Sequence, residues 1–170
     1  MPHPLVIALF PNGSDPASAA RAVRALGVTQ HQLSVVARDH HAESEMANQV
    51  GGTPGAEIED SRPAGRLGEL GAQLLAAIAI VMPGIGPIVA AGPLAAELGE
   101  IAGHAAGNLR DVLSRAGLED ARTADWEHLI RQGAVLLGVH ATAVDPRTIV
   151  NVFREHGASD VVTTTWSVGD

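Results

Sequence analysis

The sequence predicts an α+β fold, because two similar segments near its ends flank a long Gly/Ala-rich stretch. Each end segment has an apolar run rich in strand-forming residues, then a stretch of helix length, then a second such run. The stretch between them carries no charge from residue 70 to residue 96. A chain of 170 residues is long enough for one domain with a sizeable core. We therefore expect these parts to form one composite domain.

The first segment is predicted to form a strand, a helix and a second strand. The apolar run Leu5–Leu9 predicts the first strand. Asp15 and Pro16 are typical of a helix N-cap and first turn, and Gly27 is typical of a helix end. The run Gln32–Ala37 predicts the strand that closes this βαβ unit.

The last segment repeats the first. Leu5–Gly27 aligns without a gap on Val135–Gly157, and an Asp-Pro pair, an arginine and the final glycine coincide. The run Val161–Trp166 predicts the closing strand. Two βαβ units in series predict a ferredoxin-like sandwich, which is a four-stranded sheet with two helices on one face.

The middle of the chain is predicted to be an insertion between the two βαβ units. Residues 64–82 and 93–116 each show apolar residues at helical spacing, and Pro83–Pro87 interrupts them. A helical hairpin is therefore expected, followed by a short amphipathic helix over Glu119–Gln132. The expected divisions are 1–38 (first βαβ unit), 39–63 (acidic flexible linker), 64–118 (inserted helical hairpin) and 119–170 (connecting helix and second βαβ unit).

The composition excludes several function classes. The chain has no Cys, Lys or Tyr, which excludes thiol nucleophiles, iron–sulfur clusters and the lysine of a phosphate-binding loop. The net charge of −8 argues against a nucleic-acid partner. No nucleophile elbow or dinucleotide fingerprint occurs, so a non-enzymatic role is favoured. No targeting signal is evident at the start of the sequence, and a cytoplasmic location is expected.

Small residues dominate the predicted hairpin, and glycines recur every four residues on its second arm. This spacing lets helix backbones approach closely. Exposed apolar stripes would leave a sticky surface, so we expect self-association into a homodimer or a larger assembly. The expected interface residues are Ile78, Pro83, Gly84, Gly86, Pro87, Leu94, Leu98, Gly99, Ile101, Gly103 and Gly107.

The hairpin also carries a family resemblance. The run Ile78–Ala96, with Pro-Gly-Ile-Gly-Pro at its centre, resembles the signature of bacterial general stress proteins, also called heat-induced stress proteins. Gly117–Ala121 and Arg131–Val139 look like the acidic helix start and the apolar strand of that family. The resemblance covers about residues 5–165 and implies a stress-associated protein of undefined biochemistry. Polar residues interrupt the second arm, which departs from the family and argues against a purely membrane-embedded hairpin.

Those polar residues suggest a metal site. Glu97, Glu100 and His104 are spaced so that one helix face carries all three, and Glu69 on the first arm is expected to lie level with Glu100. Iron or another divalent metal would suit these ligands, and a dimer of hairpins would double them. The alternative is that these residues form a solvated or subunit-flanking face.

One further histidine has two interpretations. His140 lies just past the Val135–Val139 strand and takes the place of Phe10 in the repeat. It is either a packed residue at the end of a strand or a ligand contact at the sheet edge.

Three functions stay open from the sequence. The first is a stress-associated, non-enzymatic module that assembles through its hairpin. The second is a metal-binding, ferroxidase-like protein with a carboxylate–histidine site at a hairpin dimer interface. The third is a peripheral membrane protein whose hairpin enters the bilayer.

Overall fold

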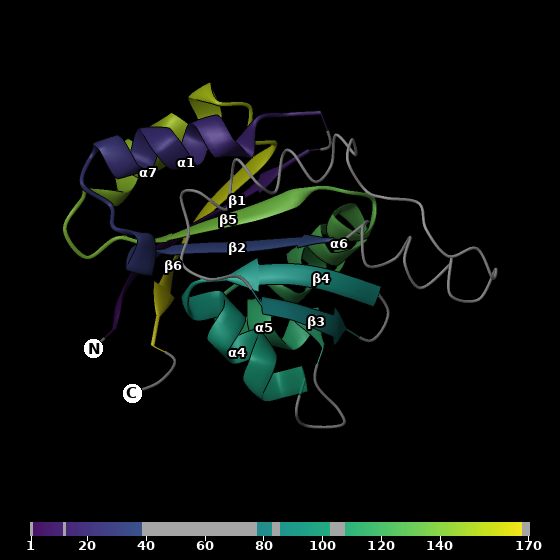
Figure 1. Cartoon of the computed structure of the whole chain (residues 1–170). Coiled ribbons are helices and arrows are strands. Elements are labelled where there is room, and N and C mark those ends of the chain that lie inside the picture. The colour runs from purple at the N-terminus through teal and green to yellow at the C-terminus, as the bar shows by residue number, and fades with distance from the viewer. Residues whose placement is uncertain (1, 12, 39–77, 83–85, 103–107, 168–170) are drawn as a thin grey trace.

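The computed structural model describes residues 2–11, 13–38, 78–82, 86–102 and 108–167 (Figure 1). The elements in chain order are β1 (His3–Phe10), α1 (Pro16–Ala25), the short 3-10 helix η1 (Gln30–Gln32), β2 (Leu33–Arg38), β3 (Ile78–Met82), β4 (Gly86–Ala91), α4 (Pro93–Ala102), α5 (Leu109–Arg115), α6 (Asp120–Arg131), β5 (Val135–His140), α7 (Pro146–Glu155) and β6 (Asp160–Trp166).

The strands form one six-stranded sheet in the order β3-β4-β2-β5-β1-β6. Every neighbouring pair is antiparallel. The two predicted strand–helix–strand segments are confirmed as β1-α1-β2 and β5-α7-β6, and their four strands lie side by side. The remaining two strands, β3 and β4, extend the sheet beyond β2.

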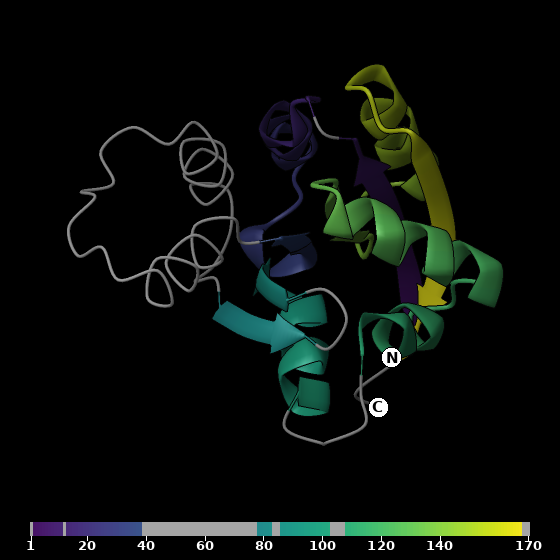
Figure 2. The same cartoon turned by 90° about the vertical axis from the view of Figure 1, so that its right-hand side faces the viewer.

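Helices cover both faces of the sheet. The helices of the two βαβ segments, α1 and α7, lie together on one face, as expected, and α4, α5 and α6 lie on the other (Figures 1 and 2). The expectation of four strands with helices on one face is therefore incomplete, because the described insertion adds two strands and a second helical layer. The sheet is consequently the middle of three layers.

The strand β1, which lies between β5 and the edge strand β6, is buried on both of its faces. Val6, Ala8 and Phe10 face α1 and α7, whereas the alternate residues of β1 face the other helices. Such a strand is apolar throughout rather than alternating. The rings of Phe10 and Phe153 meet edge to face, with centroids 5.6 Å apart, and this contact fixes α7 on the sheet.

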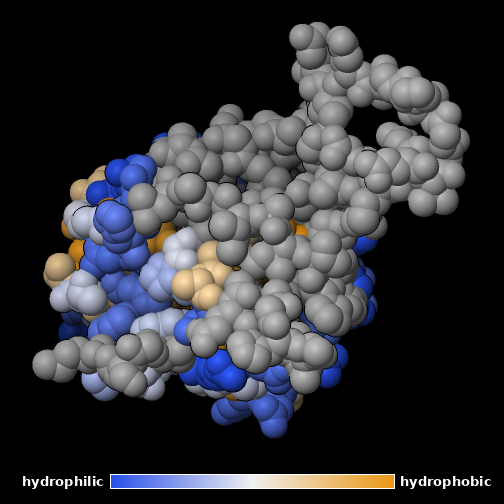
Figure 3. Space-filling view, turned by 60° about the horizontal axis from the view of Figure 1, so that its bottom comes forward, coloured by the Kyte–Doolittle hydropathy of each residue, from blue (hydrophilic) through white to orange (hydrophobic). Residues whose placement is uncertain are grey.

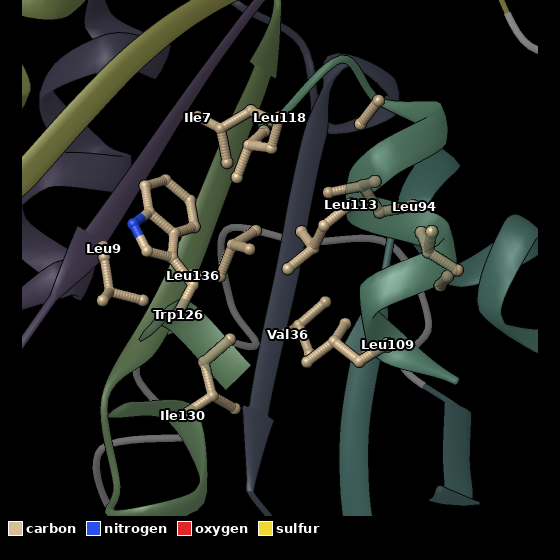
Figure 4. Close-up of a cluster of buried hydrophobic side chains, with 14 of the residues drawn as sticks. Ile7, Leu9, Val36, Leu94, Leu109, Leu113, Leu118, Trp126, Ile130 and Leu136 are labelled. Carbon is tan, nitrogen blue, oxygen red and sulfur yellow. The ribbon is translucent and has the colours of Figure 1, made fainter. Parts of the chain in front are cut away.

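The second core lies between the sheet and α4, α5 and α6 (Figure 4). Trp126 of α6 is the largest fully buried side chain of the described residues and lies over β5. Its indole Nε1 donates a hydrogen bond of 2.9 Å to Asp160 Oδ2 at the start of β6. The predicted amphipathic helix over Glu119–Gln132 is confirmed by α6, although Leu129 is exposed.

The predicted helical hairpin is wrong at its tip. Ile78–Met82, expected to end the first helical arm, is a strand, and it pairs antiparallel with a second strand at Gly86–Ala91 in the segment between the arms. The physical reason is that β2 needs a partner along its second edge, and β4 supplies it through residues 88–91. Pro87 lies beyond this register, where its missing N–H removes no bond to β2. Short β-branched runs fit either helix or strand by periodicity alone, and here the sheet decides.

The predicted second arm is also divided. α4 begins at Pro93, as expected, but α5 begins separately at Leu109. Asn108 is extended and caps α5, because its side chain accepts from the Asp111 backbone N–H while Asp111 bonds back to the Asn108 N–H. The first arm up to residue 77 and the acidic linker at 39–63 lie outside the described residues.

The repeat predicted from the sequence is seen in the helix ends. Asp15 accepts from the backbone N–H of Ser18, and Asp145 accepts from that of Arg147. Each following helix has proline in its first turn. A glycine with positive φ follows the last helical residue by two positions in each case, Gly27 after α1 and Gly157 after α7.

Candidate functional site

The structure brings no two of the four predicted metal ligands into described contact. Glu97 lies on α4 and is buried, and Arg115 Nη1 of α5 lies 3.6 Å from its Oε2. Glu100 lies on the same helix, and Glu69 and His104 lie outside the described residues. Among the residues that the structure describes, no group of three or more His, Cys, Asp or Glu is placed to hold a metal ion. The Arg115 guanidinium provides a counter-charge for the Glu97 carboxylate, whose buried Oε2 accepts no hydrogen bond from the described residues.

The predicted interface residues fall on three elements. Ile78 belongs to β3, Gly86 and Pro87 belong to β4, and Leu98, Gly99 and Ile101 belong to α4. Four others are outside the described part of the chain, and they are Pro83, Gly84, Gly103 and Gly107.

Leu94 is corrected as an interface residue. Its side chain is buried in the core of the chain and packs over Gly138 of β5, where any larger residue would meet it. A residue already enclosed by its own chain cannot cover a partner's surface without unfolding α4 from the sheet.

Among the described strands, β3 lies at one end of the sheet. It pairs with β4 on one side, with Ile78 opposite Ala90 and Ile80 opposite Ile88. No other strand within the described ranges pairs with it. Its sequence Ile-Ala-Ile-Val-Met carries no charge and no proline, the two features that commonly protect an edge strand.

Elsewhere, the described surface offers little apolar area. Leu26 and Leu129 are the exposed large hydrophobic residues of the described segments. On the face drawn in Figure 3, most coloured surface is hydrophilic. Such scattered apolar residues do not form a docking patch.

A buried polar cluster lies where β5 ends and the neighbouring strand β1 begins. His140 ends β5, and its Nδ1 lies 2.8 Å from Nε2 of His3 at the start of β1. Its Nε2 lies 3.4 Å from Oγ of Ser34 on β2. Ser34 Oγ also accepts the backbone N–H of Leu94 in the first turn of α4, at 3.1 Å. Residues of four separate elements, β1, β2, β5 and α4, are therefore joined by one series of hydrogen bonds.

The surroundings of His140 keep its imidazole neutral. The residue is 3% exposed, and the ring of Trp166 stands edge to face against it with a centroid distance of 5.1 Å. Burial and the neighbouring His3 lower the pKa of His140 to about 4. A serine and a histidine in contact suggest nucleophilic catalysis, but Ser34 is completely buried and no substrate can reach it.

Of the two interpretations of His140, the structure shows a packed residue at the end of its strand. His3 and Ser34 were not singled out from the sequence. Ser34 carried a signal, because it is the one polar residue within the Leu33–Ala37 run of a strand. His3 carried none, since its place opposite Trp166 depends on the register of β1 with β6.

Comparisons with known proteins add no relative. No family model, no curated protein and no solved structure matches this chain. In the described segments, no helix is long and apolar enough to cross a membrane.

Proposed function

We propose that this protein is a stress-associated, non-enzymatic module that forms homodimers through the edge strand β3. The observation that carries the proposal is the position of β3, an uncharged five-residue strand at the end of a six-stranded sheet. Edge strands expose unpaired N–H and C=O groups, which are a template for pairing with another strand. The stress association rests on the resemblance of the Ile78–Ala96 sequence.

The partner is a second copy of this chain. Two β3 strands pair antiparallel around a two-fold axis, which joins the two sheets and uses each edge once. Because β3 has no charge, two copies do not repel each other at the contact, although the net charge of each chain is −8. α4 packs against β3 and β4, so Leu98, Gly99 and Ile101 belong to the element that flanks this interface.

The body that carries this edge is proposed to be a ferredoxin-like sandwich in the cytoplasm. The order β2-β5-β1-β6, with α1 and α7 on one face, supports this interpretation. The insertion then has a clear role, because it covers the second face and moves the assembling edge away from β2. A metal-binding or membrane-inserted hairpin stays a prediction from the sequence.

The test is a pair of lysine substitutions on the two edge strands of the full chain. Ala79→Lys places a charge on β3 at the position that pairs with Val89, avoiding the positions that pair with the buried Ile88 and Ala90. Thr163→Lys is the matched control, because Thr163 is exposed on the opposite edge strand β6.

Analytical ultracentrifugation distinguishes the outcomes. We expect the unmodified chain and Thr163→Lys to sediment as dimers and Ala79→Lys to sediment as a monomer with an unchanged circular dichroism spectrum. A dimer that survives Ala79→Lys, or one that dissociates only with Thr163→Lys, refutes assembly through β3.

A further inference from the structure

The buried cluster at His140 connects α4 to the sheet. The backbone N–H of Leu94 bonds to Ser34 Oγ, Ser34 contacts His140, and His140 contacts His3. These bonds link α4, β2, β5 and β1 in that order. The cluster is separate from the β3 edge, so a role for it does not depend on the proposed function.

When His140 is neutral, every contact of this hydrogen-bonded cluster joins one donor to one acceptor. Leu94 N–H donates to Ser34, so the Ser34 hydroxyl hydrogen is available for the lone pair of His140 Nε2. His140 then carries its proton on Nδ1 and donates it to His3 Nε2. In this arrangement each contact from Leu94 N–H through Ser34 and His140 to His3 is a hydrogen bond with one donor and one acceptor.

Protonation of His140 changes this pattern. An imidazolium has N–H groups at both ring positions, so Nε2 no longer accepts the Ser34 hydroxyl hydrogen, which loses its acceptor in the cluster. The new charge is also buried, and it lies near the positively polarised N-terminus of α4.

Within the described structure, the groups that face His140 add no compensating negative charge. β1 contributes His3, β2 contributes Ser34, β6 contributes the Trp166 ring and α4 contributes its first-turn backbone. Among these contacts, His3 is the titratable group. A positive charge on either ring therefore opposes one on the other.

We propose that His3, Ser34 and His140 form a proton-operated latch, which holds the first turn of α4 on the sheet at neutral pH and releases it locally in acid. Release separates Leu94 from Ser34 and from its packing site over Gly138. The sheet stays intact, because the buried backbone pairing of β1 with β5 and β6 does not use these side chains.

Amide hydrogen exchange of the full chain, followed by NMR, measures the release at Leu94. If the opened state restores the ordinary histidine pKa of 6.5 and the closed state keeps a pKa of about 4, opening increases about 20-fold between neutral pH and about pH 5. We expect the protection factor of the Leu94 amide, corrected for intrinsic exchange, to fall by that factor. An unchanged protection factor overturns the latch.

Two variants assign the effect to His140. His140→Asn cannot titrate, and we expect its Leu94 protection to vary less than twofold over the same range. His128→Gln removes an exposed histidine of α6 and should keep the full wild-type change. A full pH response in His140→Asn refutes the assignment. If that variant does not fold, the NMR titration of His140 in the unmodified chain decides, because a midpoint near 6.5 contradicts the latch.

Low urea concentrations separate local release from global unfolding. Exchange at the centre of β1, at Ile7, requires global unfolding and should accelerate with urea. Amide exchange at Leu94 through a local opening should hardly accelerate with urea. Equal urea dependence of the two amides shows that α4 is not released on its own and overturns the proposal.

Discussion

Gly92 lies so close to the backbone of Leu33 that a Cβ at position 92 would come within 1.8 Å of the Leu33 carbonyl oxygen. Gly92 joins β4 to α4 and has a φ of 79°. Both properties require glycine, because L side chains rarely adopt this φ and no Cβ can share space with a carbonyl oxygen. The chain can therefore pass from the edge hairpin into α4 only at a glycine.

We expect Gly92→Ala to lower the free energy of unfolding by about 3 kcal/mol or more, because β2 and the turn must move apart. Gly27→Ala is the matched control, since Gly27 also has positive φ but nothing lies within 4 Å of its Cβ position. Its expected cost is about 1 kcal/mol, from backbone strain alone. Urea denaturation of both variants measures the difference, and equal losses would contradict the close approach at Gly92.

Ser34→Ala should destabilise the fold although it removes only one oxygen atom. The substitution leaves the buried N–H of Leu94 and Nε2 of His140 without their partner. Such a loss costs about 1–3 kcal/mol. Ser18→Ala removes a half-buried hydroxyl on α1 whose partners, Asp15 and Arg21, can bond to water instead, and it should cost less than about 0.5 kcal/mol. Urea unfolding followed by tryptophan fluorescence compares the two variants. Equal losses would show that the buried hydrogen bonds of Ser34 contribute nothing to the free energy of unfolding.

Stability is expected to fall in acid because of His140. Its pKa of about 4 in the folded protein lies below the ordinary 6.5, so the unfolded chain binds the proton more tightly. The contribution of neutral His140 to the free energy of unfolding is complete above pH 6.5 and is lost as the pH falls toward 4. The total loss of unfolding free energy is about 3 kcal/mol.

Urea unfolding at several pH values checks this dependence. His140→Asn should have a shallower loss of stability between about pH 6.5 and pH 4 than the unmodified chain. The same slope in both proteins would mean that other groups cause the acid sensitivity.

The two helix caps of the repeat should contribute equally. Asp15→Ala and Asp145→Ala each remove a side-chain acceptor from a first-turn N–H, and each is expected to cost about 1 kcal/mol. Thermal unfolding of the two single variants and the double variant provides the test. Because the caps lie on different helices, the double variant should show the sum, and a strongly non-additive result would contradict independent caps.

Local signals predicted the two βαβ segments well. Asp-Pro pairs, closing glycines and β-branched runs act within a few residues, so their consequences are visible without knowledge of the fold. Asp15 and Gly157 accordingly have their predicted roles.

The tip of the predicted hairpin was wrong because its conformation depends on distant residues. Ile78–Met82 has enough apolar residues for a helical stripe, but the free edge of β2 recruits the following segment into the sheet. The buried cluster was missed for the same reason, since the contact between His3 and His140 spans most of the chain. A polar residue within an apolar strand, as at Ser34, is the local sign that such a contact exists.

Native mass spectrometry of the full, unmodified chain without detergent is the decisive test of the proposed dimer, because it counts subunits and weighs bound ions together. Assembly through one β3 edge per chain predicts a dimer with no added metal mass. A monomer at every concentration contradicts the assembly, and a metal-loaded species would restore the carboxylate–histidine site as the better explanation.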